Sequence, residues 1–239
     1  PLRADFLFLY FYSNTVQEEN LTVEPELILK ENPAGRKSQF FLPDGTVVWL
    51  NSESSLAYEV DSERKVRIVN LHGEAFFDVA EDKSRPFSVK TGAITTTALG
   101  TSFLISSYKD EPLVIALLTG KVEVDIALNN AERIKLTKGE GLEIDLTQEI
   151  VNSLTFDPET ILAWTRKTII FDNVSMFEIK RVLENWYGVE IDFVNRPASN
   201  LLMSGKFKDQ SLENVLEGLS HSARFKYELE KDKVTLEFN

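Results

Sequence analysis

The sequence predicts an all-β domain, built as a sandwich, a roll or a β-solenoid, followed by a small α+β domain of two βαβ units. Two observations carry this prediction. Short alternating runs separated by glycine-containing turns dominate the first part of the chain, and such runs are typical of strands. In the last third, two segments have apolar residues with a helical period. The predicted segments are 1–14 (membrane-proximal), 15–156 (all-β), 157–168 (linking helix) and 169–239 (α+β).

The amino-acid composition excludes several classes of function. The 239 residues carry a formal net charge of −12, which would repel nucleic acid, so we expect no nucleic-acid partner. The chain has no cysteine, which excludes disulfides and thiolate chemistry. Its two histidines, His72 and His221, are far apart in the sequence. We therefore expect neither a metal site nor a cofactor.

The first segment contains one apolar run, Phe6–Tyr12, with Arg3 and Asp5 just before it. A membrane helix needs about 20 apolar residues, so this run is too short to span a bilayer. It fits either an N-terminal strand or interfacial segment, or the end of a truncated transmembrane helix. The chain starts at Pro1 and its first methionine is Met176, which indicates that an upstream segment precedes it.

The clearest strand signal is LPDGTVVWLN. Pro43, Asp44 and Gly45 provide the residue types that reverse a chain, so the runs on either side should form a hairpin. Further runs of strand length follow: KVRIVNL, EAFFDVA, PFSVK, LVIALLTG, KVEVDIAL and GLEIDL.

The linking helix is predicted from Asp157, a good N-cap, followed by Pro158 at the first helical position. We expect Trp164 to pack this helix against one of the flanking domains.

A repeat of 36 residues organises the last domain. Phe171–Ser175 and Phe207–Ser211 each resemble a strand end leading into a helix cap. Ser175 and Glu178 have the spacing of a capping box. Two helices are predicted by apolar residues at helical spacing: Ile179, Val182, Leu183 and Trp186 in the first, and Leu212, Val215, Leu216 and Leu219 in the second. The strands VEIDF and FKYEL follow them, and KVTLEF ends the chain as an extra strand in a mixed sheet.

Val234, Leu236 and Phe238 alternate along that final strand, and an edge strand can add to a partner's sheet. These three residues are therefore candidates for binding a partner protein. The alternative is that they pack on the two helices and leave only the backbone edge for contact.

No catalytic motif is present: the chain lacks G-x-S-x-G, Walker A, G-x-G-x-x-G and H-E-x-x-H sequences. We therefore expect a protein that is not an enzyme. An alternative is a carbohydrate-binding β protein or an enzyme of the cell envelope, with Trp49, Tyr58 and Phe77 as an aromatic platform. The strand pattern around each of these three favours core packing instead.

The stretch ALGTSF places a glycine and a threonine inside a strand-like run. Counting by twos puts Leu99, Thr101 and Phe103 on the inward face. Gly100 then fits a bulge or a close backbone approach. The competing hypothesis is self-cleavage, in which the Thr101 hydroxyl attacks the Gly100 carbonyl and forms an ester that water cleaves.

A family resemblance supports particular parts of this interpretation. The strings PAGRKSQFFLPDGTVVWLNSESSL, LHGEAFFDVAEDKSRPFSVKT, ALGTSF, LLTGKVEV and LTKGEG, in this order, resemble the periplasmic part of FecR-type anti-sigma regulators of the Bacteroidetes branch. AWTRKTIIFDN, EIKRVLENWYGVEIDF and SGKFKDQSLENVLEGL resemble their second domain, which is similar to the secretin and TonB short N-terminal (STN) type. The resemblance covers about residues 30 to 239.

The resemblance implies the periplasmic part of a single-pass inner-membrane protein, anchored by a transmembrane helix that is absent or truncated here. It implies two partners: the signalling domain of a TonB-dependent outer-membrane transporter, and a sigma factor bound through a cytoplasmic segment absent from this sequence. It also implies that Gly100 and Thr101 are the candidates for self-cleavage, because some members of the family are cleaved at a Gly-Thr bond in this context.

Overall fold

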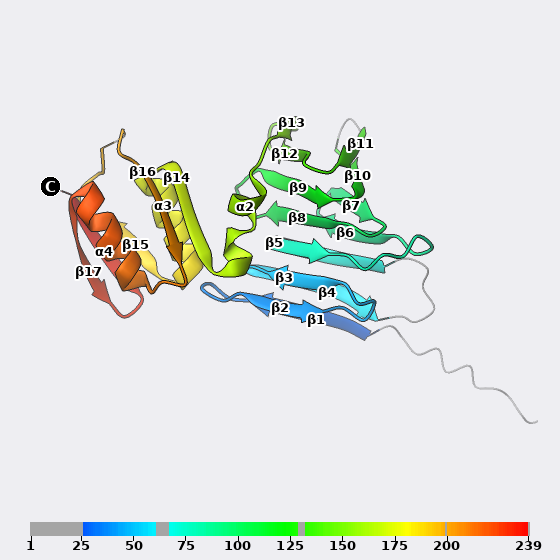
Figure 1. Ribbon diagram of the computed structural model, residues 1–239, viewed down its shortest axis with the longest axis horizontal. Coiled ribbons are helices and arrows are strands. Elements are labelled where there is room, and N and C mark those ends of the chain that lie inside the picture. The colour runs from blue at the N-terminus through cyan, green and yellow to red at the C-terminus, as the bar shows by residue number, and fades with distance from the viewer. Residues whose placement is uncertain (1–25, 61–66, 129–131, 199, 239) are drawn as a thin grey trace, which may run out of the picture.

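The computed structural model describes residues 26–60, 67–128, 132–198 and 200–238 (Figure 1). The membrane-proximal segment expected at 1–14 lies outside these residues. Among the described residues, no helix is long and apolar enough to cross a membrane.

In the first part of the chain, the described residues form a curled sheet of 13 strands (Figure 1). Its strands are β1 (Glu26–Asn32), β2 (Ser38–Phe41), β3 (Val47–Leu50), β4 (Ser54–Val60), β5 (Arg67–Asp78), β6 (Phe87–Thr91), β7 (Ile94–Ala98), β8 (Ser102–Ser107), β9 (Leu113–Thr119), β10 (Lys121–Ile126), β11 (Glu132–Thr137), β12 (Gly141–Asp145) and β13 (Ile150–Leu154). Of the three architectures that the sequence left open, a roll is the one present.

The roll is organised by β5, which belongs to both halves of the sheet. Its first half pairs with β4 and β6, and from Gly73 onward it pairs with β8 and then also with β3. Gly73 has φ +81°, and a Cβ there would lie 2.3 Å from the Ser54 Oγ. Only glycine fits both that conformation and that space, so the change of partners falls at a position without a side chain.

Alternating residues of the strands face into the roll and form one apolar core. Its largest fully buried side chains include Phe77, Phe87 and Phe103, and the Phe77 ring lies 5.2 Å from that of Phe103 and 5.8 Å from that of Phe87. Burying one such side chain stabilises the fold by about 2 kcal/mol. The LPDGT turn forms as predicted, because Asp44 accepts hydrogen bonds from the Thr46 amide and hydroxyl.

The linker contains two short helical turns, α2 (Pro158–Ile161) and the 3-10 turn η1 (Ala163–Arg166), in place of the one helix predicted. Asp157 caps α2 as predicted, accepting from the amides of Glu159 and Thr160. Trp164 is buried, as expected, and packs with Leu104 and Ala116 on the outer face of the roll.

Within its described residues, the last part of the chain has two 12-residue helices and five strands. In order they are β14 (Thr168–Ser175), α3 (Met176–Tyr187), β15 (Glu190–Phe193), β16 (Leu202–Lys208), α4 (Leu212–Ala223), β17 (Phe225–Glu230) and β18 (Lys233–Phe238). The predicted order of strand, helix and strand occurs twice. KVTLEF joins a mixed sheet as predicted, because β18 pairs parallel with β15 and antiparallel with β17. β14 and β16 form a separate antiparallel pair.

Candidate functional sites

The Gly100–Thr101 bond lies at a corner of the roll, not within a continuous strand. β7 ends at Ala98 and β8 begins at Ser102, so residues 99–101 carry the chain from one half of the sheet to the other. Thr101 is 4% exposed, which agrees with the inward position predicted for it. Leu99 is 44% exposed, contrary to the strand count, because the chain turns before it reaches β8.

The loop that follows β5 holds this corner on both sides of Gly100. The Val79 amide donates to the Thr101 carbonyl at 2.9 Å, and the Asp82 amide donates to the Leu99 carbonyl at 3.1 Å. Between these bonds, a Cβ on Gly100 would lie 2.9 Å from the Glu81 Cα. Gly100 also has φ +142°. The corner therefore needs glycine for both space and conformation.

The Thr101 hydroxyl is buried and has no hydrogen-bond partner among the described residues. Its methyl group faces the turn between β9 and β10, where a Cβ on Gly120 would lie 2.6 Å from Thr101 Cγ2 and 3.1 Å from the Gly100 carbonyl oxygen. Buried hydroxyls nearly always have a partner, so an unpaired one requires an explanation. The Gly100 carbonyl belongs to the peptide bond that precedes Thr101, so the unpaired hydroxyl is on the residue directly after the candidate bond.

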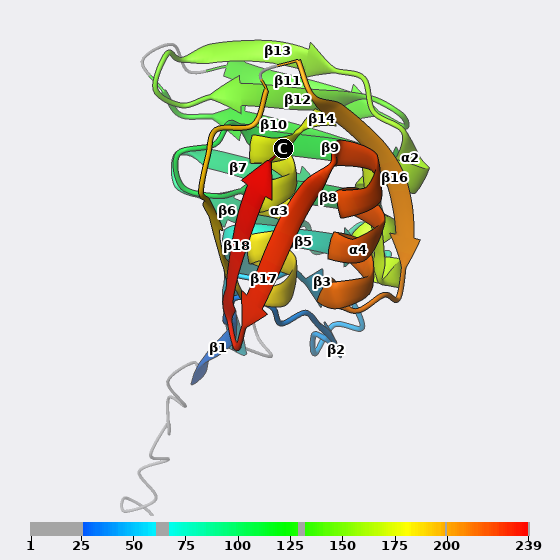
Figure 2. The ribbon, with the colours of Figure 1, turned by 90° about the vertical axis from the view of Figure 1, so that its left-hand side faces the viewer.

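A second candidate site is the interface between the roll and the C-terminal part. Figures 1 and 2 both show α3 on the side of the C-terminal part that faces the roll. The Gly35 amide donates to the Asn185 carbonyl at 3.1 Å. A Cβ on Gly35 would lie 2.8 Å from the Tyr187 carbonyl, and one on Gly188 would lie 2.9 Å from the Ala34 oxygen. The two backbones are therefore in close contact at Gly35 and Gly188, and neither of these residues has a side chain.

Polar side chains surround this backbone contact. The Lys37 ammonium lies 3.7 Å from the ring centroid of Trp186, a cation–π geometry. Arg181 Nη1 lies 2.6 Å from Glu111 Oε1. The Asn185 side chain donates to Glu53 at 3.2 Å, which adds a third polar contact across the interface.

A cleft of about 1010 Å³ opens at this interface, and Glu74 lies in its wall. The Asn51 side chain donates to Glu74 Oε1 at 2.8 Å. Burial raises the pKa of Glu74 to about 7 and lowers the pKa of Lys37 to about 8. Burial also raises the pKa of Tyr108, so its hydroxyl stays protonated. These shifts follow from removing charged groups from water.

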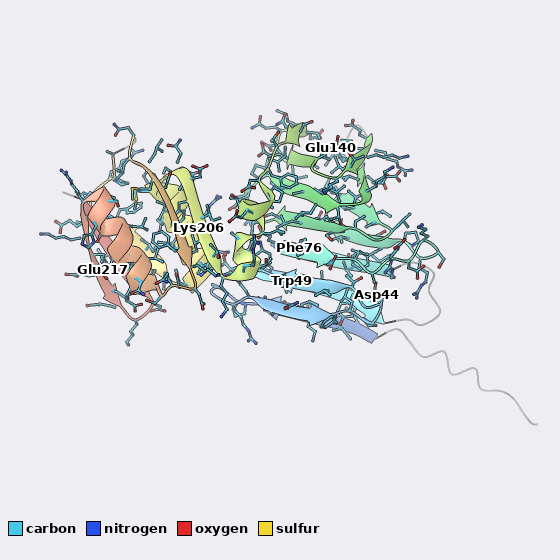
Figure 3. All side chains as sticks on the ribbon, viewed as in Figure 1. Asp44, Trp49, Phe76, Glu140, Lys206 and Glu217 are labelled. Atoms are coloured by element: carbon cyan, nitrogen blue, oxygen red, sulfur yellow. The ribbon has the colours of Figure 1, made fainter. Side chains whose placement is uncertain are left out.

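Among the described residues that line the cleft, the side chains do not form a recognisable set of catalytic groups. No group of three or more potential metal ligands occurs within the described part of the chain. Of the aromatic residues considered as a sugar platform, Tyr58 and Phe77 are buried in the core of the roll. Trp49 packs on Phe76 at 5.2 Å, close to the linker (Figure 3). These three residues therefore form no common surface.

The third candidate site is the edge of the C-terminal sheet. Val234 and Leu236 are buried against the helices, and the ring of Phe238 lies 5.8 Å from that of Phe193. Their strand, β18, lies between β15 and β17. The expectation that the final strand offers a free edge is therefore wrong, because KVTLEF pairs on both sides.

The two outer strands of this sheet differ. On β15, the Ile191 amide donates to Glu184 Oε1 at 2.8 Å, and the Ile191 carbonyl accepts from the Lys180 ammonium. Side chains of α3 thus cover the outer edge of β15. Among the described residues, β17 pairs only with β18, and no such cover lies on its other edge.

Two family models match the two parts of this structure. Residues 31–123 match the FecR protein model, and residues 168–236 match the model of the FecR C-terminal region. Together the matches cover more than half of the chain. The chain belongs to the FecR family. The resemblance inferred from the sequence motifs is therefore confirmed.

Solved structures agree with the FecR assignment. Two crystal structures of a proposed anti-sigma factor from Parabacteroides distasonis are similar to this FecR-family chain, each at 29% sequence identity. One has a TM-score of 0.76 and covers 90% of this chain and 100% of its own, and the other has a TM-score of 0.75 and covers 89% and 99%. No curated protein matches the chain. A regulatory role follows from the family and these neighbours.

The sequence motifs of this FecR-family chain did not reveal the interdomain interface. Gly35, Lys37 and Glu74 lie in the first part, whereas Trp186 and Gly188 lie more than 110 residues later. Gly188 was detectable as a helix end, and Glu74 as an acidic residue in a strand. Nothing in either local pattern indicates that they meet at one cleft.

Proposed function

We propose that this FecR-family chain is the periplasmic sensor part of a single-pass inner-membrane anti-sigma regulator. It receives a signal from the signalling domain of a TonB-dependent outer-membrane transporter. It controls a sigma factor through a cytoplasmic segment outside this sequence. The observation that carries the proposal is the match of both parts of the chain to FecR family models, with two structures of a proposed anti-sigma factor as structural neighbours.

We assign the contact with the transporter to the edge of β17 that pairs with no other strand among the described residues. An extended strand of a partner can add to an open edge through main-chain hydrogen bonds, with alternate side chains giving specificity. Along β17, Tyr227 and Leu229 are half-buried, whereas Lys226, Glu228 and Glu230 are exposed. A strand with apolar residues on one face and basic residues on the other fits this edge.

The contact can be tested by isothermal titration of the protein with the signalling domain of a transporter encoded nearby. Glu228→Lys with Glu230→Lys reverses two charges beside the open edge, and we expect the Kd to rise about tenfold. The matched control is Glu190→Lys, an exposed acid on the covered strand β15, which should bind as the wild type does. Absence of wild-type binding at about 100 μM would contradict the transporter partner. Equal weakening by both variants would contradict the β17 edge.

A second proposed activity is self-cleavage at Gly100–Thr101, supported by the unpaired hydroxyl of Thr101. The Thr101 oxygen attacks the Gly100 carbonyl carbon, the carbon–nitrogen bond breaks, and the hydroxyl proton moves to the Thr101 nitrogen, which becomes an amine. The product is an ester between Gly100 and the Thr101 side chain. Water then hydrolyses this ester, which leaves a carboxylate on Gly100 and restores the hydroxyl.

Mass spectrometry of the freshly purified, denatured protein tests the reaction. In the wild type we expect two fragments, one ending at Gly100 and the other beginning at Thr101. Thr101→Ser keeps the hydroxyl and should give the same two fragments. Thr101→Ala should stay intact. An intact wild-type chain would remove this activity without affecting the transporter contact.

A further inference from the structure

A buried ion pair contacts the loop whose amides bond to the backbone around Gly100. Arg67 Nη1 lies 2.6 Å from Asp44 Oδ2, with side chains 9% and 10% exposed. The pair joins the LPDGT turn to β5. Figure 3 labels Asp44 at the end of the roll remote from the C-terminal part.

Arg67 also forms hydrogen bonds with the loop after β5, residues 79–86, near both ends of that loop. Its Nη1 donates to the Ala80 carbonyl at 3.1 Å, and its Nε donates to the Arg85 carbonyl at 3.0 Å. From the other side, the Ala80 amide donates to Thr46 Oγ1 at 3.2 Å. The planar guanidinium supplies several donors in fixed directions, so one side chain can fix two carbonyls and a carboxylate together.

The loop between those two ends is stiffened locally. Asp82 accepts hydrogen bonds from the Ser84 amide and hydroxyl, and its other oxygen accepts from Arg85 Nε at 2.7 Å. The residues between β5 and this turn are those that touch the corner. Val79 and Asp82 bond to the carbonyls on either side of Gly100, and a Cβ on Gly100 would lie 2.9 Å from the Glu81 Cα.

We propose that Arg67, fixed by Asp44, is a positioning residue for cleavage between Gly100 and Thr101, a proposal that rests on the self-cleavage activity above. Arg67 holds the loop, the loop holds Gly100 at positive φ, and the Gly120 turn bounds Thr101 on the opposite side. The Thr101 hydroxyl and the Gly100 carbonyl are thereby kept in one relative orientation. Arg67 touches neither reacting atom, so it acts through the loop.

The decisive variant is Arg67→Lys. Lysine retains the charge opposite Asp44 but lacks the fork that reaches both loop carbonyls. We expect the rate of appearance of the two fragments to fall about tenfold or more, because small misplacements of reacting groups have large effects on rate. The matched control is Arg133→Lys, which alters an exposed arginine 2.6 Å from Asp125 and should cleave at the wild-type rate.

Hydrogen exchange separates positioning from general loss of structure. In Arg67→Lys, the amides of Val79 and Asp82 should exchange faster, while core amides of β8 keep their protection and the melting temperature stays close to that of Arg133→Lys. Should Arg67→Lys not fold, Glu81→Gly is the substitute, because it removes the exposed side chain whose Cβ and Cγ lie 3.0 Å from where a Cβ on Gly100 would be. This variant should also slow cleavage.

The outcomes are distinct. An uncleaved wild-type chain overturns self-cleavage, and this inference with it. A cleaved wild-type chain whose rate is unchanged in Arg67→Lys, or in Glu81→Gly where that variant replaces it, overturns the positioning role alone. Slower cleavage with faster exchange at Val79 and Asp82, and an unchanged Arg133→Lys control, supports it.

Discussion

The two strand–helix–strand units of the C-terminal part share a local sequence pattern but have different surroundings. Both helices begin at a serine cap, Ser175 and Ser211, and end at a residue in the left-handed conformation. That last residue is Gly188 in the first unit and Arg224 in the second, with φ +69° and +54°. The first helix end meets the roll, where a Cβ would strike the Ala34 oxygen, whereas the Arg224 side chain is exposed.

The same contrast recurs along the helices. Trp186, which lies under the Lys37 ammonium, corresponds 36 residues later to the exposed Ser222. The strand after α3 has its edge covered by Lys180 and Glu184, whereas β17 after α4 pairs on one side only among the described residues. The first unit therefore docks on the roll, and the second leaves one strand edge uncovered by the described residues. The two units are similar in sequence pattern but differ in their contacts.

The largest expected effect is at the two helix ends. Gly188→Ala should destabilise the protein by about 3 kcal/mol, since it adds a left-handed alanine and a backbone clash. Arg224→Ala keeps the left-handed position without that clash and should cost about 1 kcal/mol at most. Urea unfolding of both variants measures the difference. Equal costs would show that docking of α3 does not require glycine.

The second-largest loss of stability is expected when the ring of Trp186, which packs against the roll, is removed. Trp186→Ala should cost about 2 kcal/mol, because the ring is half-buried and carries the contact with Lys37. Ser222→Ala, at the equivalent exposed position, should change stability by less than about 0.5 kcal/mol. Small-angle scattering should also show a more extended Trp186→Ala protein. An unchanged scattering profile would indicate that the backbone contact alone holds the two parts together.

The cleft beneath the docked unit should make stability depend on pH. Because the folded-state pKa of Glu74 is raised from 4.5 to about 7, the folded protein retains a proton between these values that the unfolded chain has released. Stability from this group is full below 4.5 and is lost as the pH rises to about 7. The loss should be of order 1 kcal/mol, as Glu74 is partly exposed.

Glu74→Gln should remove this slope, which unfolding titrations at about pH 5 and about pH 8 would measure. An unchanged slope would assign the pH dependence to other groups.

The smallest expected difference in stability is between variants of the two N-terminal helix caps. In the first unit, Ser175 Oγ accepts from the Glu178 amide, and the Glu178 carboxylate accepts from the Ser175 amide, so two donors are satisfied. In the second, Ser211 Oγ accepts from the Asn214 amide at 3.3 Å, and the residue at the N3 position is Asn214 in place of a glutamate. Ser175→Ala and Ser211→Ala should each cost about 1 kcal/mol, the first by a few tenths more. A larger loss in Ser211→Ala would indicate that the reciprocal box adds nothing.

Local structure was largely predictable from the sequence. The LPDGT turn, the Asp157 and Ser175 caps and the amphipathic helix around Ile179 all depend on interactions within a few residues, so spacing alone reveals them. The family assignment was also predictable, because its motifs lie in the same order along the chain. The glycine inside the strand-like run ALGTSF also indicated a bulge or a close backbone approach at Gly100.

Only the tertiary structure decided which of these elements meet. KVTLEF became a central strand, Glu74 and Trp186 came to one interface, and Arg67 joined the loop that holds Gly100. Each of these contacts joins residues distant in sequence. Alternation and period specify which face of an element is apolar, but not which neighbour covers it, and that choice rests on packing the whole chain at once.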